Sequence, residues 1–228
     1  MHILPESLCR FLRSSAPAIL LGFLLTVPPA QAGSQEEALA AARRGNASTL
    51  SKLLNSSAVS PDTTDKEGNS LLILATRDSY VEAATAILHF HPRVDHHNHN
   101  GDSALMIAAS KGDMKLLDLL LANGAKTDPS NGKNTWTALH YAALEGKLPV
   151  LERLLTAGAN INAVTPNLSD ALMLAARNGH TDIVQRLLKT PIELDRRNDR
   201  GLTAEEWARS KGNTKIAKLI AEARTARR

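Results

Sequence analysis

The stretch TALHYAALEGKLPVLERLLTAGANINA, residues 137–163, decides the fold of this chain of 228 residues. It opens with Thr137, whose hydroxyl can accept a hydrogen bond from the free N–H groups of a helix's first turn. Gly146 ends the first segment with a residue that adopts a left-handed conformation at little cost. A second amphipathic segment follows, with Pro149 in its first turn, where a helix accepts proline readily. The stretch therefore predicts two short helices packed as a hairpin.

The first half of this stretch recurs along the chain. Its copies are NSLLILATRDS (69–79), DSALMIAASKG (102–112), WTALHYAALEG (136–146), SDALMLAARNG (169–179) and LTAEEWARSKG (202–212), and they start 33 or 34 residues apart. Each copy has a capping side chain at the same register: Ser70, Ser103, Thr137, Asp170 and Thr203. Small residues follow, and these let neighbouring helices approach closely. A period of about 33 residues predicts a stack of helical hairpins.

These copies resemble the ankyrin repeat, whose pattern is D-x-x-G-x-T-P-L-H-x-A-A-x-x-G-H followed by a leucine-rich helix. The resemblance covers nearly all of residues 35–223 and implies an all-α solenoid of about six repeats. The expected domain is residues 33–228, divided into residues 35–64 (N-terminal cap), 65–97, 98–131, 132–164, 165–197 and 198–228 (C-terminal cap). Glu205 and Glu206 replace the usual Leu and His, as expected where a terminal repeat faces water. One extra residue around Asn131 to Asn134 predicts a bulged turn.

Residues 1–32 are expected to be a signal peptide. Two arginines precede a short apolar run at residues 16–27, and the sequence AQA at residues 30–32 is the small-x-small pattern that signal peptidase reads. The run is shorter than the roughly 20 residues that a membrane-spanning helix needs. We therefore expect cleavage after Ala32, a periplasmic or secreted location, and no membrane association of the mature chain. Cys9, the only cysteine, leaves with the signal, so packing alone must stabilise the fold.

The sequence contains no motif for catalysis: no G-x-S-x-G elbow, Walker loop, H-E-x-x-H or paired-carboxylate motif is present. A net charge of +4 is too small for a nucleic-acid-binding surface. The resemblance implies a non-catalytic protein, monomeric on its own and without a cofactor, that binds another protein. The leading hypothesis is a periplasmic scaffold that inhibits or protects an enzyme. A secreted host-directed effector is an alternative, although a cleavable Sec-type signal argues against direct injection.

Five histidines gather in one short window: His89, His91, His96, His97 and His99. Neutral imidazoles at this density, with aspartates nearby, are suited to Zn²⁺, Cu²⁺ or Ni²⁺. The hypothesis of a metal site makes the protein a metal-binding or oxidative-stress accessory. A solvated polar turn and a pH-sensitive contact are the alternatives. His140 and His180 stand at consensus positions of the repeat, and we expect both to be structural.

The resemblance implies binding through the finger turns and the inner face of the first helices. Residue by residue, the predicted contact positions are Lys66, Asn69, Arg77, Asp102, Lys111, Trp136, Tyr141, Leu144, Glu145, Arg177, Asn178 and Arg200. Trp136 stands where a polar residue is usual, and an exposed tryptophan is typical of an energetic anchor. Trp136→Ala is then expected to abolish partner binding with little change in melting temperature. The alternative is that its ring folds down over the longer loop.

Overall fold

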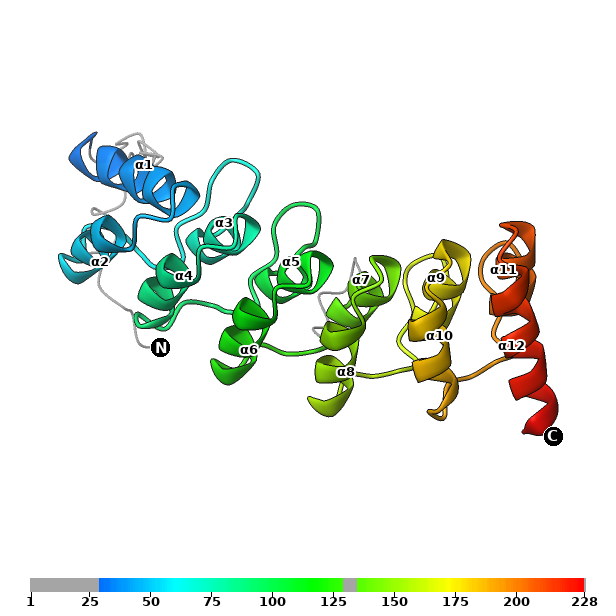
Figure 1. The fold of residues 1–228 in the computed structure, drawn as a ribbon. Coiled ribbons are helices and arrows are strands. Elements are labelled where there is room, and N and C mark those ends of the chain that lie inside the picture. Colours follow the sequence, from blue (N-terminus) through cyan, green and yellow to red (C-terminus); the bar gives the residue numbers. More distant parts are fainter. Residues whose placement is uncertain (1–28, 129–134, 228) are drawn as a thin grey trace, which may run out of the picture.

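The computed structural model describes residues 29–128 and 135–227, where the chain forms a row of helical hairpins (Figure 1). The first helices of the hairpins are α1 (Pro29–Arg43), α3 (Leu71–Arg77), α5 (Ala104–Lys111), α7 (Ala138–Leu144), α9 (Ala171–Asn178) and α11 (Ala204–Ser210). The second helices are α2 (Ala47–Asn55), α4 (Val81–Leu88), α6 (Met114–Ala122), α8 (Leu148–Thr156), α10 (Thr181–Leu188) and α12 (Thr214–Ala226). Twelve helices and no strand in these ranges confirm the expected all-α solenoid.

The five predicted capping residues explain where α3, α5, α7, α9 and α11 begin. Each side-chain oxygen accepts a hydrogen bond from the backbone N–H three residues later, over 2.9 Å at Asp170 and 3.4 Å at Ser103 and Thr137. Replacing such a cap by alanine typically costs about 1 kcal/mol. The helices close on residues with positive φ, and Ser79 takes this conformation (φ 61°) where the other copies have glycine. The sequence therefore sets both ends of each first helix.

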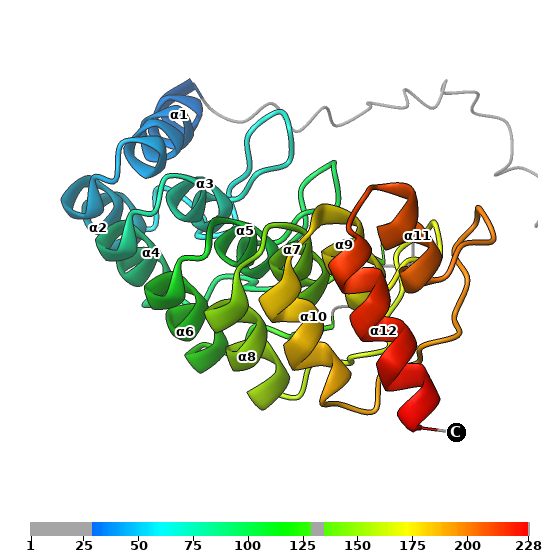
Figure 2. The same cartoon turned by 45° about the vertical axis from the view of Figure 1, so that its right-hand side comes forward.

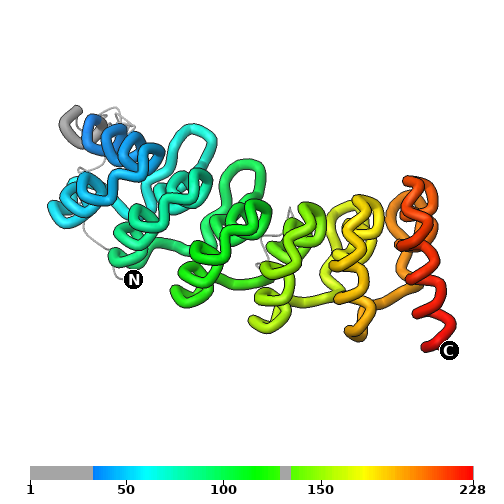
Figure 3. The backbone as a smooth tube through the Cα atoms, in the orientation of Figure 1, coloured from blue at the N-terminus to red at the C-terminus, as the bar shows by residue number. Residues whose placement is uncertain are grey.

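The two layers of helices give the stack its curvature. From α3 to α12, neighbouring first helices pack more closely than neighbouring second helices, because only fully buried alanines such as Ala108, Ala109, Ala142 and Ala143 lie between the first helices. Figure 2 shows the second helices as a separate row, and the tube in Figure 3 bends toward the side of the first helices. That side, which carries the finger turns, is the concave face of the molecule.

A ladder of side chains fixes the spacing of the hairpins on the other side. Acidic or amide oxygens in the loop after one hairpin accept a hydrogen bond from a backbone N–H of the following loop, over 2.7 to 3.1 Å. The pairs are Asp62 with Arg93, Asp95 with Lys126, Asp128 with Asn160, and Asn162 with Glu193. Because the ladder repeats with the period of the sequence, it holds successive hairpins in the same register.

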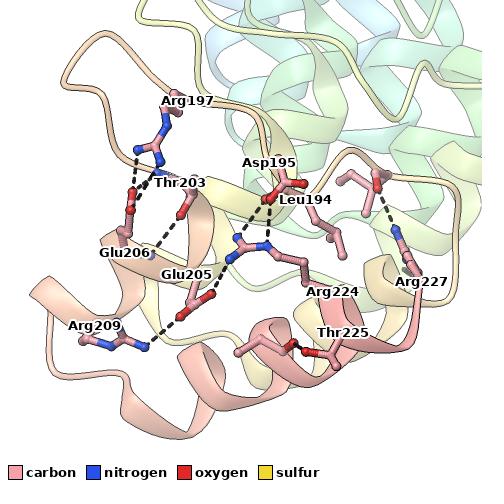
Figure 4. Close-up of polar contacts among 12 residues, drawn as sticks. Leu194, Asp195, Arg197, Thr203, Glu205, Glu206, Arg209, Arg224, Thr225 and Arg227 are labelled. Atoms are coloured by element: carbon pink, nitrogen blue, oxygen red, sulfur yellow. Dashed lines mark hydrogen bonds and ion pairs between the residues drawn. The ribbon is translucent and has the colours of Figure 1, made fainter.

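The C-terminal hairpin corrects one expectation about its polar residues (Figure 4). Glu205 does not face water: it is only 8% exposed, and its two oxygens lie 2.7 Å from the guanidinium groups of Arg209 and Arg224. Burial of a carboxylate is tolerated here because both oxygens are paired with cations. Glu206 lies further out and accepts the backbone N–H of Thr203 over 2.8 Å, which completes a capping box. Arg227 donates to the carbonyl of Leu188 and covers the end of α10.

At the other end, α1 begins at Pro29, so the predicted cleavage site after Ala32 falls inside this helix of the unprocessed chain. Residues 1–28, which carry the rest of the predicted signal peptide, lie outside the described residues, as does the extra residue around Asn131 to Asn134. None of the described helices is long and apolar enough to cross a membrane.

Candidate functional site: a hollow on the concave face

A hollow of about 320 Å³ opens on the concave face where α3, α5 and α7 meet. Its lining comes from three successive repeats and consists of Arg77, Asp102, Met106, Ile107, Ser110, Lys111 and Tyr141. Four of these side chains are among the predicted contact positions: Arg77, Asp102, Lys111 and Tyr141. The structure therefore brings together residues that are 64 positions apart in the sequence.

Ser110 makes room for the hollow. It stands seven residues after the cap of its helix, where the neighbouring first helices carry the larger side chains of Arg77, Leu144 and Arg177. Met106, 1% exposed, and the half-buried Ile107 lie beside it in the lining. A serine here, next to helices that carry Arg77 and Leu144 at this position, leaves an apolar depression without any change in the backbone repeat.

Tyr141 and Asp102 form one wall of the hollow. The Tyr141 hydroxyl donates a hydrogen bond of 2.6 Å to Oδ1 of Asp102. Burial, together with this bond to a carboxylate, raises the pKa of Tyr141, so the phenol stays protonated and remains the donor. The bond ties the finger of one repeat to the first helix of the next and holds the ring in place.

Trp136 is not the exposed anchor that its position suggests. It is half-buried, and its ring centroid lies 5.2 Å from that of Tyr141 and 5.9 Å from that of His140. These are distances at which aromatic rings attract each other. Trp136 therefore packs against the residues that form the wall, which corrects the expectation of a ring with little to bury against. The sequence did not show this because the packing residues lie one helical turn further along the chain.

The opposite edge of the hollow is cationic. Both Arg77 and Lys111 are exposed, and their hydrogen bonds go to uncharged groups: Arg77 donates to Oδ1 of Asn69 over 2.6 Å, and Lys111 donates to the Arg77 carbonyl over 2.7 Å. Within residues 29–128 and 135–227, neither forms an ion pair with a carboxylate. Two adjacent positive charges are thus available to a ligand.

Asn69, a predicted contact position, belongs instead to the framework. It is only 2% exposed, its amide donates to Asp65 over 3.1 Å, and its oxygen accepts from Asn98 over 2.9 Å. Burial alone would raise the pKa of Asp65, but the hydrogen bonds from Asn69 and Arg43 outweigh it and lower that pKa. A residue at the centre of such a network cannot contact a partner. The repeat pattern gave no sign of this, because the network joins two repeats.

The remaining predicted contact positions lie along the concave face, on both sides of the hollow. Lys66, Glu145 and Arg200 are exposed, and Leu144 is half-buried. Asn178 is exposed but donates to the Leu144 carbonyl over 2.8 Å. Arg177 lies 5.2 Å above the ring of Trp207. These residues extend the surface beyond the hollow, and Lys66 lines a separate depression of about 380 Å³ beside α1.

His140 and His180 are structural, as expected. Nδ1 of His140 accepts the backbone N–H of Thr137 over 3.0 Å, so Nε2 carries the proton and lies 3.0 Å from the Ala163 carbonyl. Burial lowers the pKa of His140 to about 4, which keeps the ring neutral. Nε2 of His180 lies 2.8 Å from the Leu144 carbonyl. These bonds engage both imidazoles with the backbone of the repeat.

The predicted metal site is not supported by the geometry. No group of three or more His, Cys, Asp or Glu side chains in the described part of the chain is placed to hold a metal ion. His89 and His91 follow α4, whereas Nε2 of His96 bonds to the Gly68 carbonyl over 2.8 Å. His97 is half-buried, and burial lowers its pKa, while His99 packs on Gly68. The five histidines are close in the sequence, but the folded chain places their rings in different surroundings.

Leu168 is a surface residue that the sequence analysis missed. It is 49% exposed, and it takes a left-handed conformation (φ 59°) at the finger position where other repeats have Gly68, Gly101 and Gly201. A non-glycine residue there is strained by roughly 1–2 kcal/mol. The signal in the sequence was a leucine in place of the repeat's glycine. Strain together with an exposed apolar side chain marks this finger as a second contact candidate.

Comparisons with known proteins agree with the architecture. A family profile described as "Ankyrin repeats (3 copies)" matches residues 38–127, 81–165 and 164–227. The chain is 29% identical over 153 residues to an ankyrin repeat and KH domain-containing protein, mask-1, of Caenorhabditis elegans, covering 67% of this chain and 6% of that protein. It is 27% identical over 164 residues to the mouse B-cell lymphoma 3 protein homolog, covering 70% of this chain and 37% of that protein.

A third relative is the homolog of transient receptor potential cation channel subfamily A member 1 in Caenorhabditis elegans. The identity is 32% over 122 residues, which cover 54% of this chain and 10% of the channel protein. The chain thus spans well under two thirds of the length of these relatives. The profile matches, the caps and the stacked hairpins lead to one conclusion: the chain belongs to the ankyrin-repeat family.

Proposed function

We propose that this chain is a non-catalytic scaffold that binds a partner protein through its concave face, centred on the hollow between α3, α5 and α7. Ankyrin repeats generally mediate protein–protein interactions. The observation that carries the proposal is the hollow itself: an apolar depression next to two cations without ion-pair partners in the described residues.

The framework supports this function by being rigid before binding. The ladder between hairpins and the Tyr141–Asp102 bond hold side chains from three repeats in fixed positions. A preorganised surface loses less conformational entropy when a partner binds, so more of the contact energy remains as affinity. The mixed charge of the face, with Glu145 beside Lys111 and Arg177, favours a protein over a polyanion such as nucleic acid.

The proposal includes a location and a role. Residues 1–32 have the features of a cleavable signal peptide, so we place the mature chain in the periplasm or outside the cell. Its role there is to inhibit an enzyme or to protect one as an adaptor. N-terminal sequencing of the chain recovered from the periplasmic fraction tests the location; a first residue at Gly33 supports it, and an intact Met1 contradicts it.

Affinity purification with a charge-swapped pair of variants tests the binding face. Glu145→Lys with Arg200→Glu alters exposed concave residues without changing the net charge, and Glu82→Lys with Lys189→Glu does the same on the second helices. We expect a protein recovered in stoichiometric amount by the wild type to be lost with the first variant and kept with the second. Equal recovery by both variants contradicts the proposal. Activity of the recovered enzyme, with and without added scaffold, separates inhibition from protection.

A further inference from the structure

We infer that the hollow receives one aliphatic side chain of the partner protein, and that Arg77 and Lys111 hold a carboxylate on the residue next to it. The inference rests on the proposed function and adds the chemistry that the concave face selects. It comes from the two halves of the hollow, one apolar and one cationic, which lie side by side in the same lining.

The apolar half fits a single side chain. Met106 and Ile107 lie next to Ser110, and the ring of Tyr141 comes from the neighbouring helix. A volume of about 320 Å³ stands at the low end of the range of roughly 300–1,000 Å³ for small-molecule pockets. The space therefore suits a leucine, isoleucine or methionine side chain, which would exclude water from the floor. In protein interfaces, the residues that contribute most of the binding energy generally lie in such pockets near the centre of the interface.

The cationic half of the hollow determines which charge is favoured on the partner residue next to the aliphatic one. The Lys111 ammonium donates to the Arg77 carbonyl over 2.7 Å, so the two cationic residues are adjacent. An ammonium has three donors and a guanidinium has five, and each side chain donates a single hydrogen bond to an uncharged group of the described chain. Nine other basic side chains of the same residues form ion pairs, whereas Arg77 and Lys111 line the hollow and form none. A carboxylate of the partner would supply the missing anion.

Asp102 is the acidic group of the hollow, and it is already engaged. Its Oδ1 accepts the Tyr141 hydroxyl over 2.6 Å, which directs that oxygen toward the wall. A basic residue of the partner that entered the hollow would meet the positive charges of Arg77 and Lys111 in the same lining. Charge complementarity therefore favours an acidic neighbour over a basic one.

A phage library of random dodecapeptides, panned on the purified full chain, tests the inference without knowledge of the partner. Expected is enrichment of peptides in which an aliphatic residue stands next to Asp or Glu. A synthetic copy of an enriched peptide is then titrated by fluorescence anisotropy, beside copies with Glu→Gln or Leu→Ser. Enriched peptides without an acidic neighbour, or no enrichment above that on the Ser110→Leu variant, would overturn the inference.

The chain supplies matched controls for both halves. Ser110→Leu fills the apolar half, and leucine is tolerated at this register because Leu144 occupies it in α7. Ser210 stands at the same register in α11, so Ser210→Leu is its control. We expect Ser110→Leu to weaken peptide binding by at least about tenfold, as for loss of a hot spot, and Ser210→Leu to change it by less than about twofold.

Lys111→Glu and Lys211→Glu form the second matched pair, one residue further along the same helices. We expect about tenfold weaker binding of the acidic peptide to Lys111→Glu, with a loss that shrinks at high salt, and no comparable loss for Lys211→Glu. The inference is contradicted if Ser110→Leu and Ser210→Leu weaken peptide binding equally. It is also contradicted if Lys111→Glu and Lys211→Glu do so. If the partner protein still requires Glu145 and Arg200 in that case, the proposed function stands and only the assigned chemistry fails.

Discussion

Repeats two and three meet at α3 and α5, and repeats five and six meet at α9 and α11. The two interfaces have different side chains at equivalent positions of the repeat. In the first, Arg77 borders the hollow next to the half-buried Ile107. In the second, the equivalent Arg177 lies 5.2 Å over Trp207, which is 4% exposed and takes the place of Ile107. A tryptophan at this position fills the space that an isoleucine leaves open. The hollow is thus a property of side chains on an unchanged backbone repeat.

The buried polar groups differ between the same two interfaces. Asn69 bridges to Arg77 and Asn98 in the first. Ser169 holds the equivalent position in the second, and its shorter side chain leaves Oγ of Ser169 and Nδ2 of Asn198 without a hydrogen-bond partner among the described residues. The interface with the hollow thus has a hydrogen-bond network centred on Asn69, whereas the interface without it contains the buried ring of Trp207. The hollow therefore lies beside a buried hydrogen-bond network.

The largest effect is expected from removing the tryptophan that fills the C-terminal interface. Trp207→Ala should lower the free energy of unfolding by about 3–5 kcal/mol, because a large buried ring is lost and a cavity remains. Urea unfolding followed by circular dichroism measures the change. Ile107→Ala is the matched control at the hollow and should cost less, since Ile107 is already half-exposed. Equal losses would mean that the two interfaces pack alike.

His140 stands in α7, between these two interfaces, at the position of the repeat that Met106 and Glu206 occupy in α5 and α11. We expect it to make the free energy of unfolding depend on pH. Its pKa is about 4 in the fold and 6.5 when unperturbed, so between these values the unfolded chain binds more protons. The stabilisation is present above pH 6.5 and is lost as the pH falls through 4. We expect the wild type to lose roughly 3 kcal/mol from this group between neutral pH and pH 4.

His140→Gln is the control for this pH dependence. The amide can accept from Thr137 and donate to Ala163 without titrating. Burial raises the pKa of Asp170 to about 6, and its stabilisation is present at low pH and lost as the pH rises through that value, opposite to His140. Asp170 is present in both the wild type and the His140→Gln variant, so its contribution cancels. The difference between the unfolding free energies of the two proteins therefore reports on His140. A difference that stays constant with pH contradicts the assignment.

The fold followed from the sequence because its determinants are local and repeated. Ser103 and Thr137 cap helices within their own first turn, so the spacing of such residues was enough to place them. The hollow depends on contacts between repeats, which a one-dimensional pattern does not contain. Asn69 was predicted as a contact and is buried by Asn98 of the next repeat, 29 residues away. Leu168 was missed although it replaces a glycine of the repeat, because the pattern alone does not show that the leucine keeps the left-handed conformation and is exposed.

The polar networks of the two interfaces can be exchanged. Asn69→Ser gives repeat two the residue of repeat five and leaves Asp65, Arg77 and Asn98 with fewer hydrogen bonds. We expect a loss of about 1–3 kcal/mol in the free energy of unfolding, the usual penalty for an unsatisfied buried polar group. Ser169→Asn is the reverse exchange, with an expected gain of at most about 1 kcal/mol. Denaturant titration of both variants decides whether the difference lies in this residue.

The smallest expected effect has the opposite sign and separates stability from binding. Leu168→Gly gives the finger of repeat five the glycine of Gly68, Gly101 and Gly201, which releases the left-handed strain at φ 59°. Since glycine also gains entropy in the unfolded chain, the net stabilisation should be about 0.5–1 kcal/mol, measured by urea unfolding. If Leu168 contacts the partner, the same variant binds the recovered protein more weakly although it is more stable. A variant that is less stable than the wild type would show that Leu168 packs for the fold, and its strain would then need no partner.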